Sequence, residues 1–414
     1  MRKLPLSVGL LLTMLVFVTS SALAREKVLY QFPGGERGNE PQFGLVFDSK
    51  GNAYGTTYYG GTYGWGTVFK LEQSNNGWTE QTLYSFLGSS DGYNPVGNLL
   101  IDTAGNLYGT TLYGGTGTGC QQGSYGCGGT AFALEQSNGT WKHIVLYSFC
   151  SRGGCSDGSS PDGLTFDKAG NLYGTTIAGG QLCGSYGCGT VYELSPSHGS
   201  WTQKVLHAFN EGGDGFYPSP GITIGQSGNL YGTTCCGGGY GYGIVFILKP
   251  GKHRWQEVLV YAFDGSTNYK NANGSLTLDS AGNIFGTTTG GSSGCSYQCG
   301  MVYRLSRSNG QWIEETVFTF DGTHGASPNP GLILDSTGNF YGSTLLGGTY
   351  NFGEIFELKP GKTWTIKLLY DFAGEGADAS PNPGLIFGPG GDLYGTTPGS
   401  YNSQYYGEVF EVLQ

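Results

Sequence analysis

The sequence lacks the features that define several large classes of protein. Only 12% of its 414 residues are charged, and its 78 Gly show no three-residue period, which excludes a collagen-like chain. A helical fold is disfavoured because Gly is costly inside helices. Disorder is disfavoured because 29 Tyr, 22 Phe and 7 Trp would drive the chain to collapse. These exclusions leave an all-β protein made of short strands and glycine-rich turns.

Long hydrophobic runs are absent except at the N-terminus. The apolar run Leu4–Val18 follows the basic pair Arg2-Lys3 and precedes the small-x-small sequence Ala22-Leu23-Ala24. This order predicts a signal peptide over residues 1–24, and therefore a secreted protein that is extracellular or periplasmic. An uncleaved membrane anchor is the alternative, although the run is short for a span and lacks a charged stop. We expect no membrane span after cleavage.

The net negative charge of the chain argues against nucleic acid and anionic membranes as partners. The formal net charge is −10, and loss of Arg2 and Lys3 with the leader makes it −12. An acidic surface disfavours nucleic acid and anionic membranes as partners. The sequence also shows no phosphate-binding loop, nucleotide fingerprint, Ser-His-Asp arrangement or EF-hand ligand run, so we expect no cofactor.

One repeated unit fills the mature chain seven times. Its clearest motif is G-N-x-Y-G-T-T, and three copies each depart from it once, with Phe285 in place of Tyr, Ser343 in place of the first Thr and Asp392 in place of Asn. The copies stand at 51–57, 105–111, 170–176, 228–234, 282–288, 338–344 and 391–397. Each unit offers four short strands of the forms G-L-x-x-D, N-L-Y-G-T-T, G-T-V-F-x-L and L-Y-S-F. We predict a single domain over 25–414, a seven-bladed β-propeller of four-stranded antiparallel blades. A β-solenoid is the alternative, although its repeats are usually shorter.

The two ends of the mature chain predict how the ring closes. Leu29–Phe32 is a fourth-strand sequence with no unit before it, and the seventh unit stops after its third strand, Glu408–Val412. The N-terminal strand should therefore complete the last blade, which would otherwise keep an unpaired edge. In the first hairpin of each unit, such as Asp48–Asn52, we expect Gly and Asn to supply the positive φ values.

The repeat resembles a known family. The G-N-L-Y-G-T-T and G-T-V-F-x-L units are similar to those of secreted bacterial proteins called choice-of-anchor tandem repeat GloVer-containing proteins. The resemblance covers the whole mature chain and implies export and a propeller-like repeat, but no assigned reaction. Family members carry varied C-terminal surface anchors, and this chain differs by ending on a strand.

All ten Cys fall on one side of the predicted ring. This side, here called the variable face, carries the loops from second to third strand and from fourth strand to the next blade, which vary in length between units. Four spaced pairs in an exported chain predict disulfides: Cys120–Cys127, Cys150–Cys155, Cys183–Cys188 and Cys295–Cys299. Zinc clusters are the alternative, but no C-x₂-C pair occurs, and we assign no metal. Cys235 and Cys236 are adjacent, and the sequence leaves open a strained vicinal bridge or two thiols.

Aromatic residues gather in the same loops. The residue before the third-strand Gly is Cys or aromatic, so the loop is held by a disulfide or by an apolar plug. We expect ligand-binding residues among the loop aromatics Tyr63, Trp65, Tyr125, Tyr186, Tyr240, Tyr242, Tyr297 and Tyr350. Blade four is the first choice, because Cys235-Cys236 beside Tyr240 breaks the repeat. The alternative is that these Tyr pack between neighbouring blades.

Candidate acid and base residues are weak. Asp48 and its equivalents stand at hairpins, where Asp accepts backbone N–H bonds, and Asp91 and its equivalents fit turn caps. The five His, at 143, 198, 207, 253 and 324, occupy different unit positions and look incidental, and we expect no catalytic residue.

The function expected from the sequence is a secreted or cell-surface-associated binding module, a monomer that takes a glycan or protein ligand on the variable face. The alternative is an extracellular propeller enzyme acting on polysaccharide, a lyase or a glycosidase. A cluster of carboxylate, Arg and His at the central channel would favour the enzyme.

Overall fold

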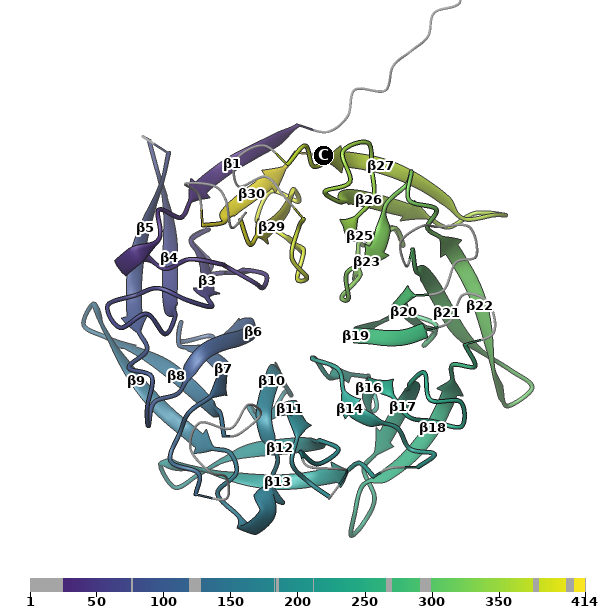
Figure 1. The fold of residues 1–414 in the computed structure, drawn as a ribbon, viewed down its shortest axis with the longest axis horizontal. Helices are drawn as coiled ribbons and strands as arrows, with labels where there is room; N and C mark the ends of the chain where they lie inside the picture. Colours follow the sequence, from purple (N-terminus) through teal and green to yellow (C-terminus); the bar gives the residue numbers. More distant parts are fainter. Residues whose placement is uncertain are drawn as a thin grey trace, which may run out of the picture.

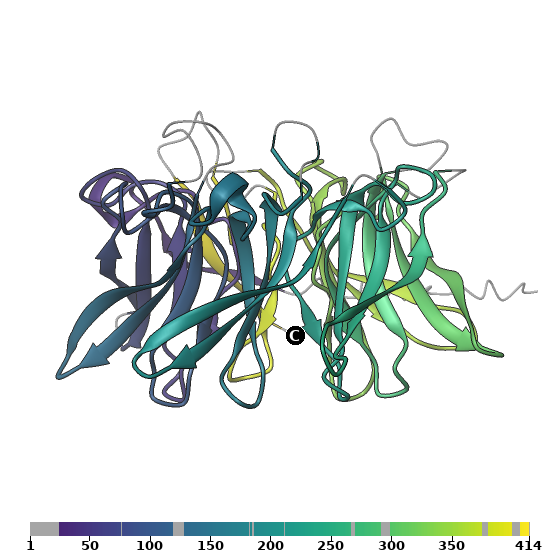
Figure 2. The same ribbon diagram turned by 90° about the horizontal axis from the view of Figure 1, so that it is seen from below.

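A computed structural model describes residues 25–413 of the chain except 76, 119–127, 182, 184–185, 211, 266–269, 291–298, 375–379 and 400–405. The expected signal peptide, 1–24, lies outside the described residues. Seven four-stranded antiparallel sheets stand around a central axis, as Figure 1 shows, and this confirms the predicted seven-bladed β-propeller. In the side view of Figure 2, short hairpins line the lower rim and the loops of the variable face lie above.

The strands follow the repeat from the inside of each blade to the outside. Blade 1 holds β2 (Val46–Phe47), β3 (Ala53–Thr57), β4 (Thr67–Ser74) and β5 (Gly77–Ser85). Blade 2 holds β6 (Tyr93–Ile101), β7 (Leu107–Tyr113), β8 (Thr130–Ser137) and β9 (Thr140–Ser148). Blade 3 holds β10 (Ser159–Phe166), β11 (Leu172–Ala178), β12 (Thr190–Ser197) and β13 (Ser200–Ala208).

In blades 4 and 6 the innermost strand is split into two short strands. Blade 4 holds β14 (Phe216–Pro218), β15 (Thr223–Ile224), β16 (Leu230–Cys236), β17 (Ile244–Lys249) and β18 (Gln256–Ala262). Blade 5 holds β19 (Lys270–Leu278), β20 (Ile284–Gly290), β21 (Met301–Ser308) and β22 (Gln311–Thr319). Blade 6 holds β23 (Ala326–Pro328), β24 (Ile333–Leu334), β25 (Phe340–Leu346), β26 (Glu354–Lys359) and β27 (Thr365–Asp371).

The last blade joins the two ends of the described chain. It holds β28 (Ile386–Phe387), β29 (Leu393–Thr397), β30 (Glu408–Val412) and, outermost, β1 (Glu26–Gln31). β1 pairs antiparallel with β30, with Gln31 opposite Glu408 and a register shift after Val28. The predicted ring closure is confirmed. Two 3₁₀ turns, η1 (Gly35–Arg37) and η2 (Gly153–Cys155), lie in fourth-to-first loops.

The first hairpin of each blade is held by its Asp. In blade 1, Asp48 accepts hydrogen bonds from the backbone N–H of Lys50 and Asn52 and from the Tyr54 hydroxyl. The structural role predicted for these Asp is confirmed. Gly51 takes a positive φ of 84°, but Asn52 does not, and the expectation for Asn is wrong. Asn52 instead donates its side-chain N–H to Asp48, which explains why Asn follows Gly in the motif.

The hydrophobic core lies between blades. The Phe that ends each L-Y-S-F-type strand is fully buried and packs on the third-strand aromatic ring of the next blade, with ring centroids 4.8–5.3 Å apart. The seven pairs are Phe32–Phe69, Phe86–Phe132, Phe149–Tyr192, Phe209–Phe246, Phe263–Tyr303, Phe320–Phe356 and Phe372–Phe410. Aromatic pairs of this kind contribute both buried area and preferred geometry. Every blade is therefore stabilised by both of its neighbours.

Candidate functional site

The variable face displays a series of exposed tyrosine rings. It comprises the described residues of the second-to-third loops, at 58–66, 114–118, 128–129, 179–181, 183, 186–189, 237–243, 299–300, 347–353, 398–399 and 406–407, with those of the fourth-to-first loops beside them. Tyr63, Tyr186, Tyr240 and Tyr350 are 55%, 59%, 64% and 56% exposed. Rings exposed to this extent do not pack between blades, which was the alternative. Tyr125 and Tyr297 lie outside the described residues.

Two other candidate aromatics act as plugs. The Trp65 ring lies over Gly88 in the next loop of its own blade, where a Cβ would come within 2.3 Å of the ring. Tyr242 covers Gly265 in the same way, and Phe352 covers Gly374. These rings hold two loops of one blade together. The variable face therefore carries two classes of aromatic residue: outward Tyr, and plugs whose rings cover a Gly of a neighbouring loop while Trp65 and Phe352 remain 41% and 37% exposed.

Disulfides hold other loops of the variable face. Cys150 is bonded to Cys155, and Cys183 to Cys188. Cys299 is also disulfide-bonded, and its expected partner Cys295 lies outside the described residues, as do Cys120 and Cys127. Cys235 and Cys236 are free thiols, and burial raises the pKa of Cys235. Disulfides and plugs give the outward Tyr a fixed scaffold.

One outward ring stands beside a polar groove. A cavity of about 620 Å³ at the junction of blades 7 and 1 is lined by Glu36, Arg37, Tyr63, Glu80 and Tyr84, among others. The Arg37 Nε lies 4.0 Å from the Glu80 Oε2, and the side chain of Arg37 is 61% exposed. Glu80 is almost fully buried, and this burial raises the pKa of its carboxyl group. The groove thus combines a flat ring with charged hydrogen-bonding groups.

The central channel has a different chemistry. The first strands of the blades enclose a cavity of about 580 Å³, lined by backbone and by residues such as Phe43, Leu100, Thr223 and Ile333. Among the described residues that line it, none is Asp, Glu, Lys, Arg or His. Acid–base catalysis needs a titratable group within hydrogen-bonding reach of the substrate. The channel as described offers none.

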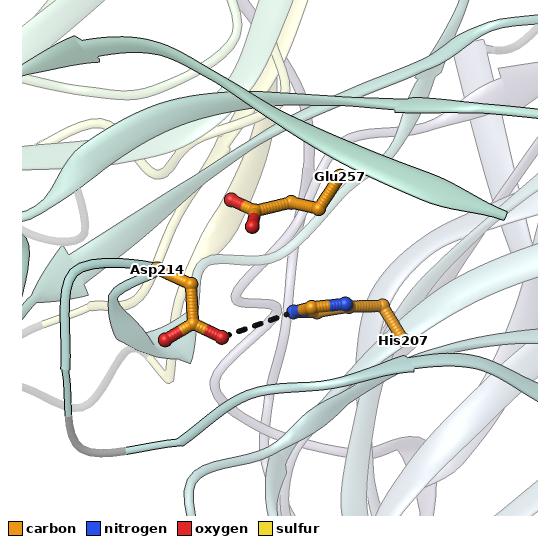
Figure 3. A group of neighbouring side chains, drawn as sticks. All are labelled: His207, Asp214 and Glu257. Atoms are coloured by element: carbon orange, nitrogen blue, oxygen red, sulfur yellow. Dashed lines mark ion pairs between the residues drawn. The ribbon is translucent and has the colours of Figure 1, made fainter.

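A group of metal-capable side chains lies between blades 3 and 4. His207 on β13, Asp214 in the following loop and Glu257 on β18 point toward one another (Figure 3). One ligand atom of each lies within 4.8 Å of the others. The sequence analysis did not predict this group, because the five His occupy different positions in the repeat and none was compared with the residue it replaces. The available signal was that His207 replaces the Tyr of the L-Y-S-F strand in one blade.

Comparison with protein families supports the repeat. The model of the Gloeobacter/Verrucomicrobia repeat matches residues 15–181, 117–294 and 291–414. No curated protein matches the chain. Across the described part of the chain, no helix has the length and apolar character needed to cross a membrane.

Solved structures share the architecture. An ulvan lyase, described as a polysaccharide lyase, was solved with a GlcA–Rha3S saccharide bound; it has a TM-score of 0.56 at 10% identity, covering 92% of this chain and 96% of its own. The extracellular domain of a one-component system from B. thetaiotaomicron has a TM-score of 0.53 at 10% identity over 92% of this chain, which spans 40% of that protein's length. A periplasmic gluconolactonase of Pseudomonas aeruginosa has a TM-score of 0.51 at 15% identity, covering 87% and 96%. These likenesses show the fold alone.

Proposed function

The chain belongs to the Gloeobacter/Verrucomicrobia repeat family, and from this premise we propose that it is an exported module that binds glycans on its variable face. The observation that carries the proposal is the set of outward Tyr rings, 55–64% exposed, on loops held by disulfides and plugs. A sugar ring presents a flat apolar face to an aromatic ring. A platform already fixed in place binds it without the entropy cost of ordering a loop.

The groove at Tyr63 supplies the remaining groups. A sugar on the Tyr63 ring would share the groove with the Arg37 guanidinium and the Glu36 carboxylate. Arg donates from a rigid fork and Glu accepts, which suits the paired hydroxyls of a pyranose. We therefore place the first sugar-binding position in this groove, and a second at Tyr240 in blade 4.

Export follows the same proposal. The signal peptide predicted over 1–24 and the disulfides Cys150–Cys155 and Cys183–Cys188 both suit an oxidising compartment. The neighbours of similar fold include an extracellular domain and a periplasmic enzyme. N-terminal sequencing of protein recovered outside the cytoplasm should begin near Arg25.

The binding role is preferred to catalysis on polysaccharide because of the channel. The ulvan lyase shows that this fold can act on polysaccharide, but the described residues of the channel include no acid or base. Turnover of a polysaccharide by the purified protein would favour the enzyme instead.

The test is a glycan array followed by titration of the best glycan. Tyr63→Ala and Tyr240→Ala should each weaken binding about 30-fold with unchanged melting, since a central aromatic contact is worth about 2 kcal/mol. Ile313→Ala is the matched control, because Ile313 is 49% exposed on the outer strand β22, away from these loops. Trp65 and Tyr242 are unsuitable, since their loss removes a plug.

Two results would contradict the proposal. One is a clean array on which no glycan binds; capture of a single protein partner by the same face would then favour the protein-ligand alternative. The other is full affinity in both Tyr variants.

A further inference from the structure

The seven blade junctions share one structural position. At this position a residue of the L-Y-S-F strand, Tyr in most blades, faces a residue of the next blade's outer strand. Where that outer strand carries the repeat Trp, the facing residue stands two positions after it. At the junction of blades 1 and 2, Tyr84 stacks on His143 with centroids 4.4 Å apart. At the junction of blades 6 and 7, the Tyr370 hydroxyl donates to Glu26 at 2.8 Å. At these two junctions a Tyr contacts the next blade by stacking or by a hydrogen bond from its hydroxyl.

The junction of blades 3 and 4 departs from this pattern. His207 stands where the other blades have Tyr or Phe, and Glu257 is the residue that faces it. Asp214 occupies the loop position at which Asp91 and Asp157 accept hydrogen bonds from Tyr84 and Tyr147. Replacing the Tyr hydroxyl by an imidazole therefore leaves two carboxylates and one ring nitrogen around a single point.

The ligand atoms at that point are buried but incompletely paired. The Nε2 of His207 lies 3.3 Å from the Oδ2 of Asp214. Yet His207 Nε2, Asp214 Oδ1 and Glu257 Oε1 are all inaccessible to solvent and make no hydrogen bond. The Asp214 Oδ2 accepts a hydrogen bond from Asn210 Nδ2 at 2.9 Å, which orients the carboxylate. Buried polar atoms without partners are costly. Asp91 Oδ1 and His143 Nε2 at the junction of blades 1 and 2 also lack partners, but among the described residues only this junction brings one ligand atom from each of three such side chains within 4.8 Å of the others.

A cation would suit the charges of the side chains at this point. Among the residues that the structure describes, neither Asp214 nor Glu257 forms an ion pair with Lys or Arg. With the imidazole neutral and both carboxyl groups ionised, such a set of side chains can ligate a cation.

We propose that His207, Asp214 and Glu257 bind a divalent transition-metal ion, with Zn²⁺ as the ion to test, and that the ion clips blade 3 to blade 4. One imidazole nitrogen and two carboxylate oxygens are ligands that Zn²⁺ accepts, with water in the fourth position. In tetrahedral Zn²⁺ sites with bonds of about 2.1 Å, ligand atoms lie about 3.4 Å apart. The His207–Asp214 distance already fits, and a small movement of the Glu257 side chain would complete the set.

The experiment uses the full mature chain stripped with a chelator and titrated with Zn²⁺ by calorimetry. We expect one ion per chain at this site and a melting temperature that rises with Zn²⁺ concentration, because the ion binds only the folded chain. His207→Tyr and Glu257→Gln should each weaken binding at least 100-fold. Both variants install residues that other junctions carry, Tyr147 and Gln203, so both should fold.

Two controls separate this site from other ligands. His324→Ala removes an exposed His–Asp pair for which the described residues supply no third ligand, and it should leave Zn²⁺ affinity unchanged. A variant with Cys235→Ser and Cys236→Ser removes the free thiols and should also retain the ion. His207→Tyr should in addition melt no lower than the stripped wild type, since it restores the Tyr–Asp hydrogen bond.

Three results would overturn the proposal: no Zn²⁺-dependent heat or melting shift in the wild type, unchanged affinity in both His207→Tyr and Glu257→Gln, or loss of the ion only in the thiol variant. If either variant fails to fold, anomalous X-ray scattering at the zinc edge from wild-type crystals decides the matter. Density between His207 and Glu257 supports the site, and its absence there refutes it.

Discussion

Asp162 is a buried carboxyl group at a position where three other blades carry a side chain that donates a hydrogen bond and blade 2 carries Val96. The equivalent side chains Ser219 and Asn329 donate to backbone carbonyls of the next blade, and Asn382 does the same across the closing junction. Asp162 is buried, and its Oδ1 has no hydrogen-bond partner. An ionised carboxylate cannot donate. Burial accordingly raises the pKa of Asp162 to about 7.

Replacing Asp162 by Asn should stabilise the propeller. The rise in pKa from 3.8 to about 7 corresponds to about 4 kcal/mol, since each pKa unit is worth 1.36 kcal/mol. In an acid whose folded pKa is raised, the folded state binds more protons than the unfolded state between the two pKa values, so stability falls as pH rises from about 4 to about 7. Asn carries a donor and no charge, so Asp162→Asn escapes this loss. Its advantage should be full above pH 7.

The assay is urea unfolding of wild type and Asp162→Asn at pH 5 and pH 8. The free energy of unfolding should favour the variant at both pH values, and by about 2–3 kcal/mol more at pH 8. Asn329→Asp is the matched reverse substitution, because it removes the donor that Asn329 offers to Pro381, and it should destabilise more strongly at pH 8. A variant no more stable than wild type at pH 8, or an advantage that does not grow with pH, would refute the reasoning.

Four further predictions concern the aromatic contacts between blades, the plugs, the ring closure by β1 and the disulfides. Tyr303→Phe should raise the free energy of unfolding by about 1–2 kcal/mol in chemical denaturation, because its buried hydroxyl has no partner and five other blades carry Phe there; equal or lower stability would contradict this. Gly88→Ala should lower the melting temperature, because the new Cβ meets the Trp65 ring, whereas Gly139→Ala, with open space around its Cβ, should cost less. Removing residues 25–32 should lower stability by several kcal/mol, and a peptide of those residues should restore it in trans unless the strand pairs elsewhere. Peptide mapping without reduction should recover Cys150–Cys155 and Cys183–Cys188 as linked peptides, not as free thiols.

The sequence predicted what depends on local repetition. The hairpin at Asp48 and the number of blades follow from spacing and turn chemistry, and the closure by β1 follows from counting strand types. Contacts between blades could not be read in this way, because they depend on how strands of different units cross. Glu257 is 50 residues from His207, and nothing local to either residue marks the other. The sequence predicted that Trp65 acts as an apolar plug, but it did not predict that the Trp65 ring covers Gly88, because that contact depends on the folding of two separate loops.

The pairing of β1 with β30 also sets an order of events during synthesis. Lys27 and its partner Glu411 are 384 residues apart, and both belong to the strands that close the ring. At about 5–20 residues per second, roughly 20–80 s separate the appearance of the two strands. During that interval β1 has no partner strand and blade 1 has only one neighbour. The nascent chain therefore has an unpaired sheet edge from the synthesis of β1 until the synthesis of β30. That edge has to be protected while the chain is being made, and not after the ring has closed.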